Sequence, residues 1–200
     1  MASISVITPT IGRATLAQTA ASVLPQLVPE DEWIVVADGD REQAASIFGS
    51  AFISDLVGGA RFTWAYEERP DSRFGNAQRD RALTLVRTSH VCFLDDDDRY
   101  EPGALALFRQ WAHDAPEAVH VGSAEWGPGH YAHGTVLWKT REFVEGNVGT
   151  CMVCYPFTPD MPRWMAHNSK GVTSDFGWMR EAAEGREIVW HGQIVATVRP

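Results

Sequence analysis

Four consecutive aspartates, Asp95 to Asp98, follow the apolar run HVCFL and are the chemically most distinctive segment of the chain. In an extended backbone, Asp95 and Asp97 would point to one face and Asp96 and Asp98 to the other. Carboxylates this close repel one another, which raises their pKa values unless a cation binds among them. Their hard oxygens suit Mg²⁺ or Mn²⁺, ions that can join a protein to a diphosphate. The segment therefore predicts a divalent-metal site; the alternative is a solvated acidic turn before the helix that opens near Pro102.

Two further turns place useful groups at the ends of apolar runs. The run Ile4–Thr8 leads into Pro9 and Thr10, and the run WIVVA at 33–37 leads into Asp38-Gly39-Asp40. A carboxylate at Asp38 could accept a hydrogen bond from a nucleobase or a ribose, although Asp-Gly is also an ordinary turn sequence.

The elements that must position these groups alternate between strand and helix over residues 3–113. Short β-branched or apolar runs predict strands at Ile4–Thr8, Trp33–Ala37, Arg61–Tyr66 and His90–Leu94. Helical spacing and proline positions predict helices at Arg13–Val23, Glu42–Phe48, Asn76–Arg87 and Pro102–Trp111. This order indicates an α/β protein with an open, doubly wound sheet. Ligands of such sheets bind beyond the carboxyl ends of the strands, where the three marked turns fall.

The sequence changes character from residue 114 onward. Short strands are predicted at Val119–Ser123, Thr135–Trp138, Thr150–Tyr155 and Ile188–Val198, with a helix at Asp175–Ala183. No linker, repeat or low-complexity stretch separates residues 1–113 from residues 114–200, so we expect the two halves to pack as one domain.

Composition and charge exclude several classes of function. The 200 residues include 17 Lys and Arg against 26 Asp and Glu, a net charge of −9, which argues against non-specific nucleic-acid binding. Three cysteines are too few for a disulfide framework. Neither a signal peptide nor an apolar run long enough to span a membrane is seen, so the sequence predicts a cytoplasmic protein.

Four segments are similar, in order and rough spacing, to the motifs of one enzyme family. They are SVITPTIGR at 5–13, VADGD at 36–40, GNAQRDRALTLV at 75–86 and FLDDDDRYEPGAL at 93–105. They resemble the SVIIPTYNR, VDDGS, GxxxARNxGI and FLDxDDxxxPxxL segments of family 2 glycosyltransferases, the last containing the DxD motif. The resemblance implies the A-type glycosyltransferase fold, a Rossmann-like twisted sheet of mostly parallel strands with helices on both faces. It also implies a nucleotide-sugar donor bound by residues 1–113, a divalent metal ion, and an acceptor bound by residues 114–200.

The same resemblance assigns roles to individual positions of the donor half. Pro9, Thr10 and Asp38 match residues that contact the base, and Arg79 matches a helix arginine that meets the base or the diphosphate. Of the aspartates, Asp95 or Asp96 would meet the ribose or a metal-bound water, and Asp97 would bind the metal directly. The chain departs from the family pattern at Ala37, Ile11, Gly12 and Asp80. These departures bear on the identity of the base more than on the class of ligand.

In the second half, Asp175 lies where the family often has the acid that serves as catalytic base. It could equally cap the helix that it opens, in which case Asp160 or Glu181 would be the next candidates. His191 resembles the late histidine that some A-type enzymes add as a third metal ligand, and an ordinary strand histidine is the alternative.

The other polar and aromatic residues of this half favour structural roles. Cys151 and Cys154 have metal-binding spacing but no second pair, and His130 and His133 lie in a glycine-rich turn. Trp126, Trp138 and Trp164 could stack on a sugar, although burial in the core is the ordinary role of tryptophan.

Together these features predict a metal-dependent glycosyltransferase that moves a sugar from a nucleoside-diphosphate sugar to the hydroxyl of an unknown glycan, lipid, protein or small-molecule acceptor. The resemblance implies inversion at the anomeric carbon. The alternatives are a nucleotide-sugar or glycan binding module without transfer activity and a sugar nucleotidyltransferase. The nucleotidyltransferase should carry a glycine-rich basic loop after its first strand, whereas TPTIGRAT has one Gly and one Arg.

Overall fold

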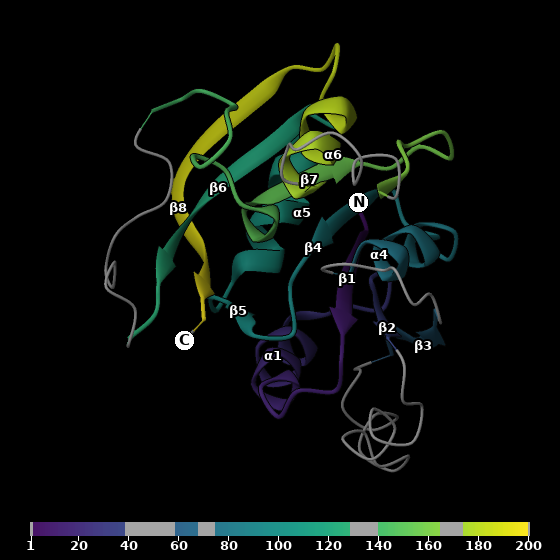
Figure 1. Ribbon diagram of the computed structural model, residues 1–200. Coiled ribbons are helices and arrows are strands. Elements are labelled where there is room, and N and C mark those ends of the chain that lie inside the picture. The colour runs from purple at the N-terminus through teal and green to yellow at the C-terminus, as the bar shows by residue number, and fades with distance from the viewer. Residues whose placement is uncertain (1, 39–58, 68–74, 129–139, 165–173, 200) are drawn as a thin grey trace.

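A computed structural model of the chain describes residues 2–38, 59–67, 75–128, 140–164 and 174–199. Within these described residues, eight strands form one sheet, in the order β3-β2-β1-β4-β7-β6-β8-β5 (Figure 1). The strands are β1 (Ile4–Thr10), β2 (Glu32–Ala37), β3 (Arg61–Tyr66), β4 (His90–Phe93), β5 (Asp98–Tyr100), β6 (Val119–Trp126), β7 (Val153–Pro156) and β8 (Ile188–Val198). The helices are α1 (Leu16–Val23), α4 (Asn76–Leu83), α5 (Ala104–Asp114) and α6 (Ser174–Ala182), with 3₁₀ turns η1 (Leu24–Gln26) and η3 (Thr150–Met152).

The centre of the sheet is parallel and fully buried. Strand β1 pairs in parallel with β2 on one side and β4 on the other, and β2 continues in parallel to β3. Every residue of β1, β2 and β4 is buried, as expected for parallel strands covered on both faces. Strand β7 joins β4 and β6 in antiparallel fashion, so the sheet continues without a break into strands of the second half.

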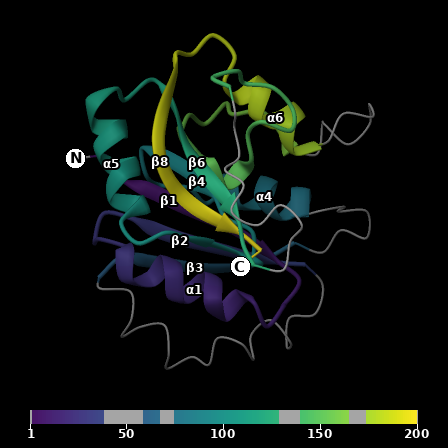
Figure 2. The ribbon, with the colours of Figure 1, turned by 90° about the vertical axis from the view of Figure 1, so that its left-hand side faces the viewer.

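Helices cover both faces of this sheet (Figure 2). Helix α5 adjoins α1 through η1, because Arg109 donates to the carbonyl of Gln26 and the Leu105 amide donates to Gln26 Oε1. On the opposite face lie α4, over β1 and β2, and α6. Among the described residues, no helix has the length and hydrophobicity needed to cross a bilayer.

The parallel pairing brings the ends of β1, β2 and β4 to one edge of the sheet. Thr10 pairs with Ala37, and the Asp38 amide donates to the Thr10 carbonyl at 2.8 Å. The Leu94 amide donates to the Ile7 carbonyl at 2.9 Å, so the aspartates that follow Leu94 lie at this same edge.

The predicted strands and helices of the described segments are confirmed, with three corrections. Strand β5 was not predicted; it forms because Asp98 to Tyr100 pair with the end of β8. Residues 150–152 form a 3₁₀ turn rather than the start of a strand. Helix α4 ends at Leu83, whereas the predicted helix continued to Arg87, and most of the side chains that α4 buries are polar. The predicted elements at Glu42–Phe48 and Thr135–Trp138 lie outside the described residues.

Candidate functional site

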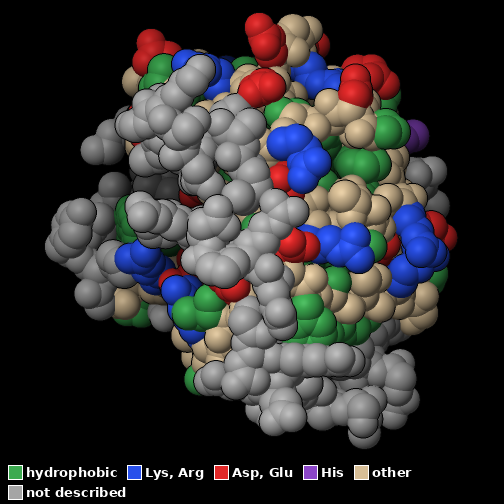
Figure 3. Space-filling model, turned by 45° about the vertical axis from the view of Figure 1, so that its right-hand side comes forward, with side chains coloured by type: hydrophobic (Ala, Val, Ile, Leu, Met, Phe, Trp, Pro, Cys, Tyr) green, Lys and Arg blue, Asp and Glu red, His purple; other side chains and the backbone are tan. Residues whose placement is uncertain are grey.

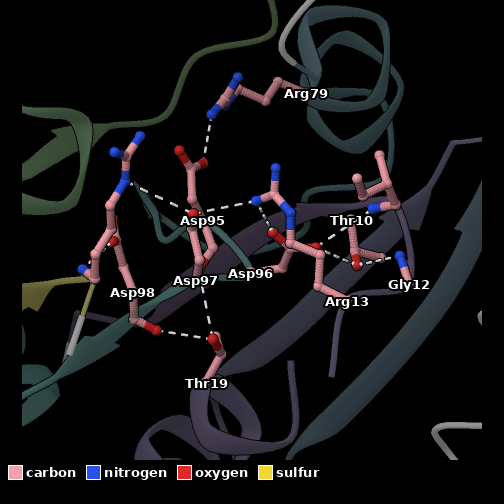
Figure 4. Close-up of polar contacts among 11 residues, drawn as sticks. Thr10, Gly12, Arg13, Thr19, Arg79, Asp95, Asp96, Asp97 and Asp98 are labelled. Atoms are coloured by element: carbon pink, nitrogen blue, oxygen red, sulfur yellow. Dashed lines mark hydrogen bonds and ion pairs between the residues drawn. The ribbon is translucent and has the colours of Figure 1, made fainter. Parts of the chain in front are cut away.

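The four aspartates form a tight turn between β4 and β5. The Asp98 amide donates to the Asp95 carbonyl at 3.1 Å. One carboxylate oxygen each of Asp95, Asp97 and Asp98 then lie within 4.8 Å of one another, while Asp96 points toward the loop after β1 (Figure 4). The alternating orientation predicted for an extended chain is therefore wrong, because the backbone reverses direction here.

Asp96 joins this turn to the loop after β1. Its buried carboxylate accepts hydrogen bonds from Thr10 Oγ1 at 2.7 Å, from Arg13 at 2.8 Å and from the Ile11 amide at 3.3 Å. The Gly12 amide donates to Thr10 Oγ1 at 2.9 Å, which extends the network (Figure 4). Both Asp96 oxygens are thus engaged with the protein, and the side chain orders the loop that carries Thr10.

Burial and mutual repulsion oppose negative charge in this turn. Burial raises the pKa of Asp98 to about 8, with a further contribution from Asp95. Burial also raises the pKa of Asp97, although Arg13 opposes this shift. Asp97 lies 3.2 Å from Arg13 and 3.8 Å from Arg199. The turn is therefore a place where added positive charge stabilises the ionised carboxylates.

A divalent cation fits this donor set. Three carboxylate oxygens converge in the group that we call the acidic cluster, Asp95, Asp97 and Asp98. Hard oxygen ligands of this kind are preferred by Mg²⁺ and Mn²⁺. The raised pKa values of Asp97 and Asp98 have the same physical origin, namely buried negative charge that a cation would compensate.

Arg79 lies beside the acidic cluster. Its side chain is 2% exposed; one terminal nitrogen donates to Asp95, and the other lies 3.9 Å from Asp175 Oδ1. Burial disfavours the charge of a guanidinium, but Asp95 and Asp175 outweigh it, and the pKa of Arg79 is raised. Arg79 therefore remains a cation between an acid of the cluster and the acid that opens α6.

The predicted donor-site residues and Asp175 surround one cavity of about 510 Å³. Its lining includes Pro9, Thr10, Asp38, Arg79, Asp95, Asp96, Asp97 and Asp175, together with Ile11, Arg13, Gly75, Gln78 and Arg199. Acidic and basic side chains lie next to one another on the molecular face shown in Figure 3. A cavity with both signs of charge and converging carboxylates can hold an anionic ligand together with a metal ion.

His191 is not near this cavity. It lies on β8, seven residues before Val198, and Val198 is the residue that pairs with Asp98. Seven residues of strand place His191 roughly 20 Å from the acidic cluster. Its ring stacks on Trp111 at 3.7 Å, and its Nε2 lies 3.2 Å from Nδ1 of His120. The structure therefore does not bring His191 to the acidic cluster, and the strand-histidine alternative agrees with its position.

The remaining candidates also lie away from the cavity. Asp160 and Glu181 are exposed and do not line it. Cys151 and Cys154 are free and buried, and burial raises their pKa values, as suits structural thiols. Trp164 is buried, whereas Trp126 is half-buried at the end of β6. His130, His133 and Trp138 lie outside the described residues.

Sequence reasoning did not assign a site role to six residues, namely Ile11, Arg13, Gly75, Gln78, Asp98 and Arg199. Arg13, the last residue of the first motif, could have been found as the cation nearest to that loop. Asp98 was noted in the sequence but not assigned to the metal. Gly75 has a φ of +76°, and an added Cβ would lie 2.8 Å from Cβ of Pro9, so only glycine lets α4 approach β1 this closely. Arg199 carries no local signal, because only the pairing of β5 with β8 brings it to the cluster.

Comparisons with known proteins agree with this architecture. A model of the family described as glycosyl transferase family 2 matches residues 5–184. A search of curated proteins finds no match. Among solved structures, S. aureus TarS superimposes with a TM-score of 0.75 at 16% identity, over 99% of this chain and 37% of that protein.

Two further structures are similar at low identity. S. aureus TarS 1–349 in complex with UDP has a TM-score of 0.75 and 17% identity, over 98% of this chain and 60% of that one. The mannosyltransferase PcManGT from Pyrobaculum calidifontis, in complex with GDP-Man and Mn²⁺, has a TM-score of 0.63 and 13% identity, over 98% and 56% of the two chains. These likenesses confirm the predicted A-type glycosyltransferase fold. The chain spans between 37% and 60% of the length of these structures.

Proposed function

Since this chain belongs to glycosyl transferase family 2, we propose that it transfers a sugar from a nucleoside-diphosphate sugar to an acceptor hydroxyl. The observation that carries the proposal is the cavity lined by Arg79, Asp175 and two acids of the acidic cluster, Asp95 and Asp97. In this proposal, residues 1–113 bind the donor and residues 114–200 contribute the acceptor side.

The donor would be held by the edge where β1, β2 and β4 end. Asp38 and Pro9 line the part of the cavity beside the parallel strands, where we place the base. Asp97, with Asp95 and Asp98, would hold Mn²⁺ or Mg²⁺ against the diphosphate. When bound, such an ion stabilises the negative charge of the departing nucleoside diphosphate as a Lewis acid. In support, one similar solved structure contains UDP, and another contains GDP-Man and Mn²⁺.

Asp175 would act as the general base. Its carboxylate accepts the proton of the acceptor hydroxyl while the acceptor oxygen bonds to the anomeric carbon. The bond from that carbon to the diphosphate oxygen breaks at the same time, and the nucleoside diphosphate leaves. Attack from the face opposite to the leaving group inverts the anomeric carbon, as the family resemblance implies. Arg79, 3.9 Å from Asp175, favours its ionised form, which is the form that can accept a proton.

A two-stage experiment tests this proposal. A thermal-shift screen of nucleotide sugars, with Mn²⁺ and with EDTA, identifies the donor, because a ligand that binds only the folded state raises its apparent stability. Release of nucleoside diphosphate is then measured with and without candidate acceptors. A binding module would show donor stabilisation with no turnover under any condition. A protein that no nucleotide sugar stabilises would contradict both the transferase and the binding module.

A further inference from the structure

The face of a tryptophan covers the buried cation of the cavity. The Cζ atom of Arg79 lies 4.7 Å from the ring centroid of Trp164, which is fully buried. An indole attracts a guanidinium electrostatically, most strongly where both are desolvated. Unlike a carboxylate, the ring cancels none of the positive charge. Arg79 therefore gains a support that leaves its charge available to Asp95 and Asp175.

A second buried acid anchors this tryptophan. Asp80 follows Arg79 on α4, and its side chain is 5% exposed. One of its oxygens accepts the Trp164 backbone amide at 2.6 Å, and the other lies 3.2 Å from Arg163. Helix α4 therefore carries both the cation and the anchor of the ring that covers it. This acid is one of the departures from the family pattern, which has asparagine here.

An aromatic stack supports the tryptophan from other elements. Trp164 stacks on Trp178 at 4.6 Å with an interplanar angle of 12°, and Phe93 packs edge-on against both rings. Phe93 ends β4, two residues before Asp95, and Trp178 lies on α6, three residues after Asp175. The stack thus connects the three elements that carry Asp95, Arg79 and Asp175.

From these contacts we propose that Trp164 is a positioning residue, which fixes the guanidinium of Arg79 between Asp95 and Asp175. This role rests on the proposed glycosyl transfer, in which Asp175 is the base and Asp95 belongs to the metal cluster. Without the ring, Arg79 would lose its fixed position between these two carboxylates. Ordinary core packing is the competing explanation, and it predicts lower stability without any dependence on Arg79.

A double-mutant cycle separates the two explanations. Trp164→Leu keeps an apolar side chain and removes the π face, so we expect kcat to fall about tenfold at saturating donor and Mn²⁺. Trp164→Phe keeps a π face and should remain within about threefold of the wild type. In an Arg79→Met background, Trp164→Leu should have little further effect on kcat, because a residue that acts through Arg79 has nothing left to position. Trp111→Leu, which removes another buried indole beside His191, is the control for lost packing.

An activity-independent measurement accompanies the cycle. The Nε–H resonance of Arg79, assigned with Arg79→Lys, should be shifted by the Trp164 ring current in the wild type. It should move in Trp164→Leu and not in Trp111→Leu. If Trp164→Leu does not fold, Asp80→Ala carries the same test, since it removes the anchor and keeps the ring.

The outcomes distinguish this inference from the proposed function. A wild-type protein without turnover on any donor contradicts the proposed function, while the Arg79 resonance still reports whether Trp164 positions it. If Trp164→Leu lowers kcat by the same factor with and without Arg79→Met, the inference is overturned. A folded Trp164→Leu variant whose Arg79 resonance and kcat are unchanged would overturn it as well.

Discussion

Replacing Asp97 with asparagine tests the metal site most directly. The variant keeps the size of the side chain and removes its charge. Two unit charges 4.8 Å apart, the limit on the oxygens of the acidic cluster, repel by about 3.5 kcal/mol at an effective dielectric constant of 20. The attraction of Asp97 to Arg13 and Arg199 acts in the opposite direction. Those arginines are 48% and 58% exposed, so each pair contributes only about 0.2–1 kcal/mol.

Since the lost repulsion exceeds the two lost attractions together, Asp97→Asn should fold and be more stable than the wild type, by about 1.5–3 kcal/mol in its free energy of unfolding. Metal binding should respond differently, because a carboxylate ligand is lost. Replacing even the outer partners of a metal site typically lowers affinity by about 10–100-fold, so we expect at least about a 100-fold loss of Mn²⁺ affinity here. Nucleoside diphosphate should then bind as weakly in Mn²⁺ as it does in EDTA.

Isothermal titration calorimetry with UDP and GDP, first in EDTA and then in Mn²⁺, measures both effects, and urea denaturation gives the stability. Asp160→Asn is the matched control, because it removes an exposed carboxylate outside the cavity. It should change neither the affinity for Mn²⁺ and nucleoside diphosphate nor the free energy of unfolding. Equal wild-type affinity in EDTA and Mn²⁺ would refute the metal bridge. An Asp97→Asn variant that unfolds would instead favour the acidic turn as a structural cap.

Three further predictions follow from the same contacts. Asp175→Asn should preserve the start of α6 and binding of donor and Mn²⁺, and should lower transfer about 10²–10⁴-fold; normal transfer would exclude Asp175 as the base. Burial lowers the pKa values of His90, His120 and His191 in the folded protein, the last to about 4. Below pH 6.5, the ordinary pKa of histidine, these three side chains therefore bind more protons in the unfolded chain than in the folded protein. Carboxylates with raised pKa values, such as Asp98, act in the opposite direction, so the test compares two proteins. In urea denaturation from pH 6.5 toward pH 4, the wild type should lose stability relative to His191→Gln, and identical pH slopes for the two proteins would contradict the lowered pKa of His191. Gly75→Ala should cost about 1–3 kcal/mol in thermal or urea unfolding, because its Cβ would meet the proline of β1 at 2.8 Å with φ at +76°; wild-type stability would show that α4 can move away.

Local sequence predicted the parallel core and the edge at which the cavity lies. The β-branched and apolar runs of β1, β2 and β4 have a strong strand preference and are buried on both faces, so the pattern of the chain alone identifies them. In a parallel sheet their carboxyl ends must meet at one edge. Pro9, Thr10, Asp38 and Asp95 could therefore be placed together without knowledge of any long-range contact.

The remaining features depend on contacts between distant segments. Asp98 pairs with Val198, one hundred residues away, and this pairing creates β5 and brings Arg199 to Asp97. The same register holds His191 far along β8 from the acidic cluster, although its residue type suits a metal ligand. No local pattern encodes such a register, since it results from the packing of whole strands and helices.

The orientation of individual side chains was likewise decided by tertiary structure. The turn at Asp95–Asp98 directs Asp96 into the loop after β1, whereas strand geometry alone would have grouped Asp96 with Asp98. Residue types and order along the chain determined which chemistry was available at this edge. Only the folded arrangement decided which carboxylates converge, because electrostatic and hydrogen-bond energies depend on distances that sequence spacing does not specify.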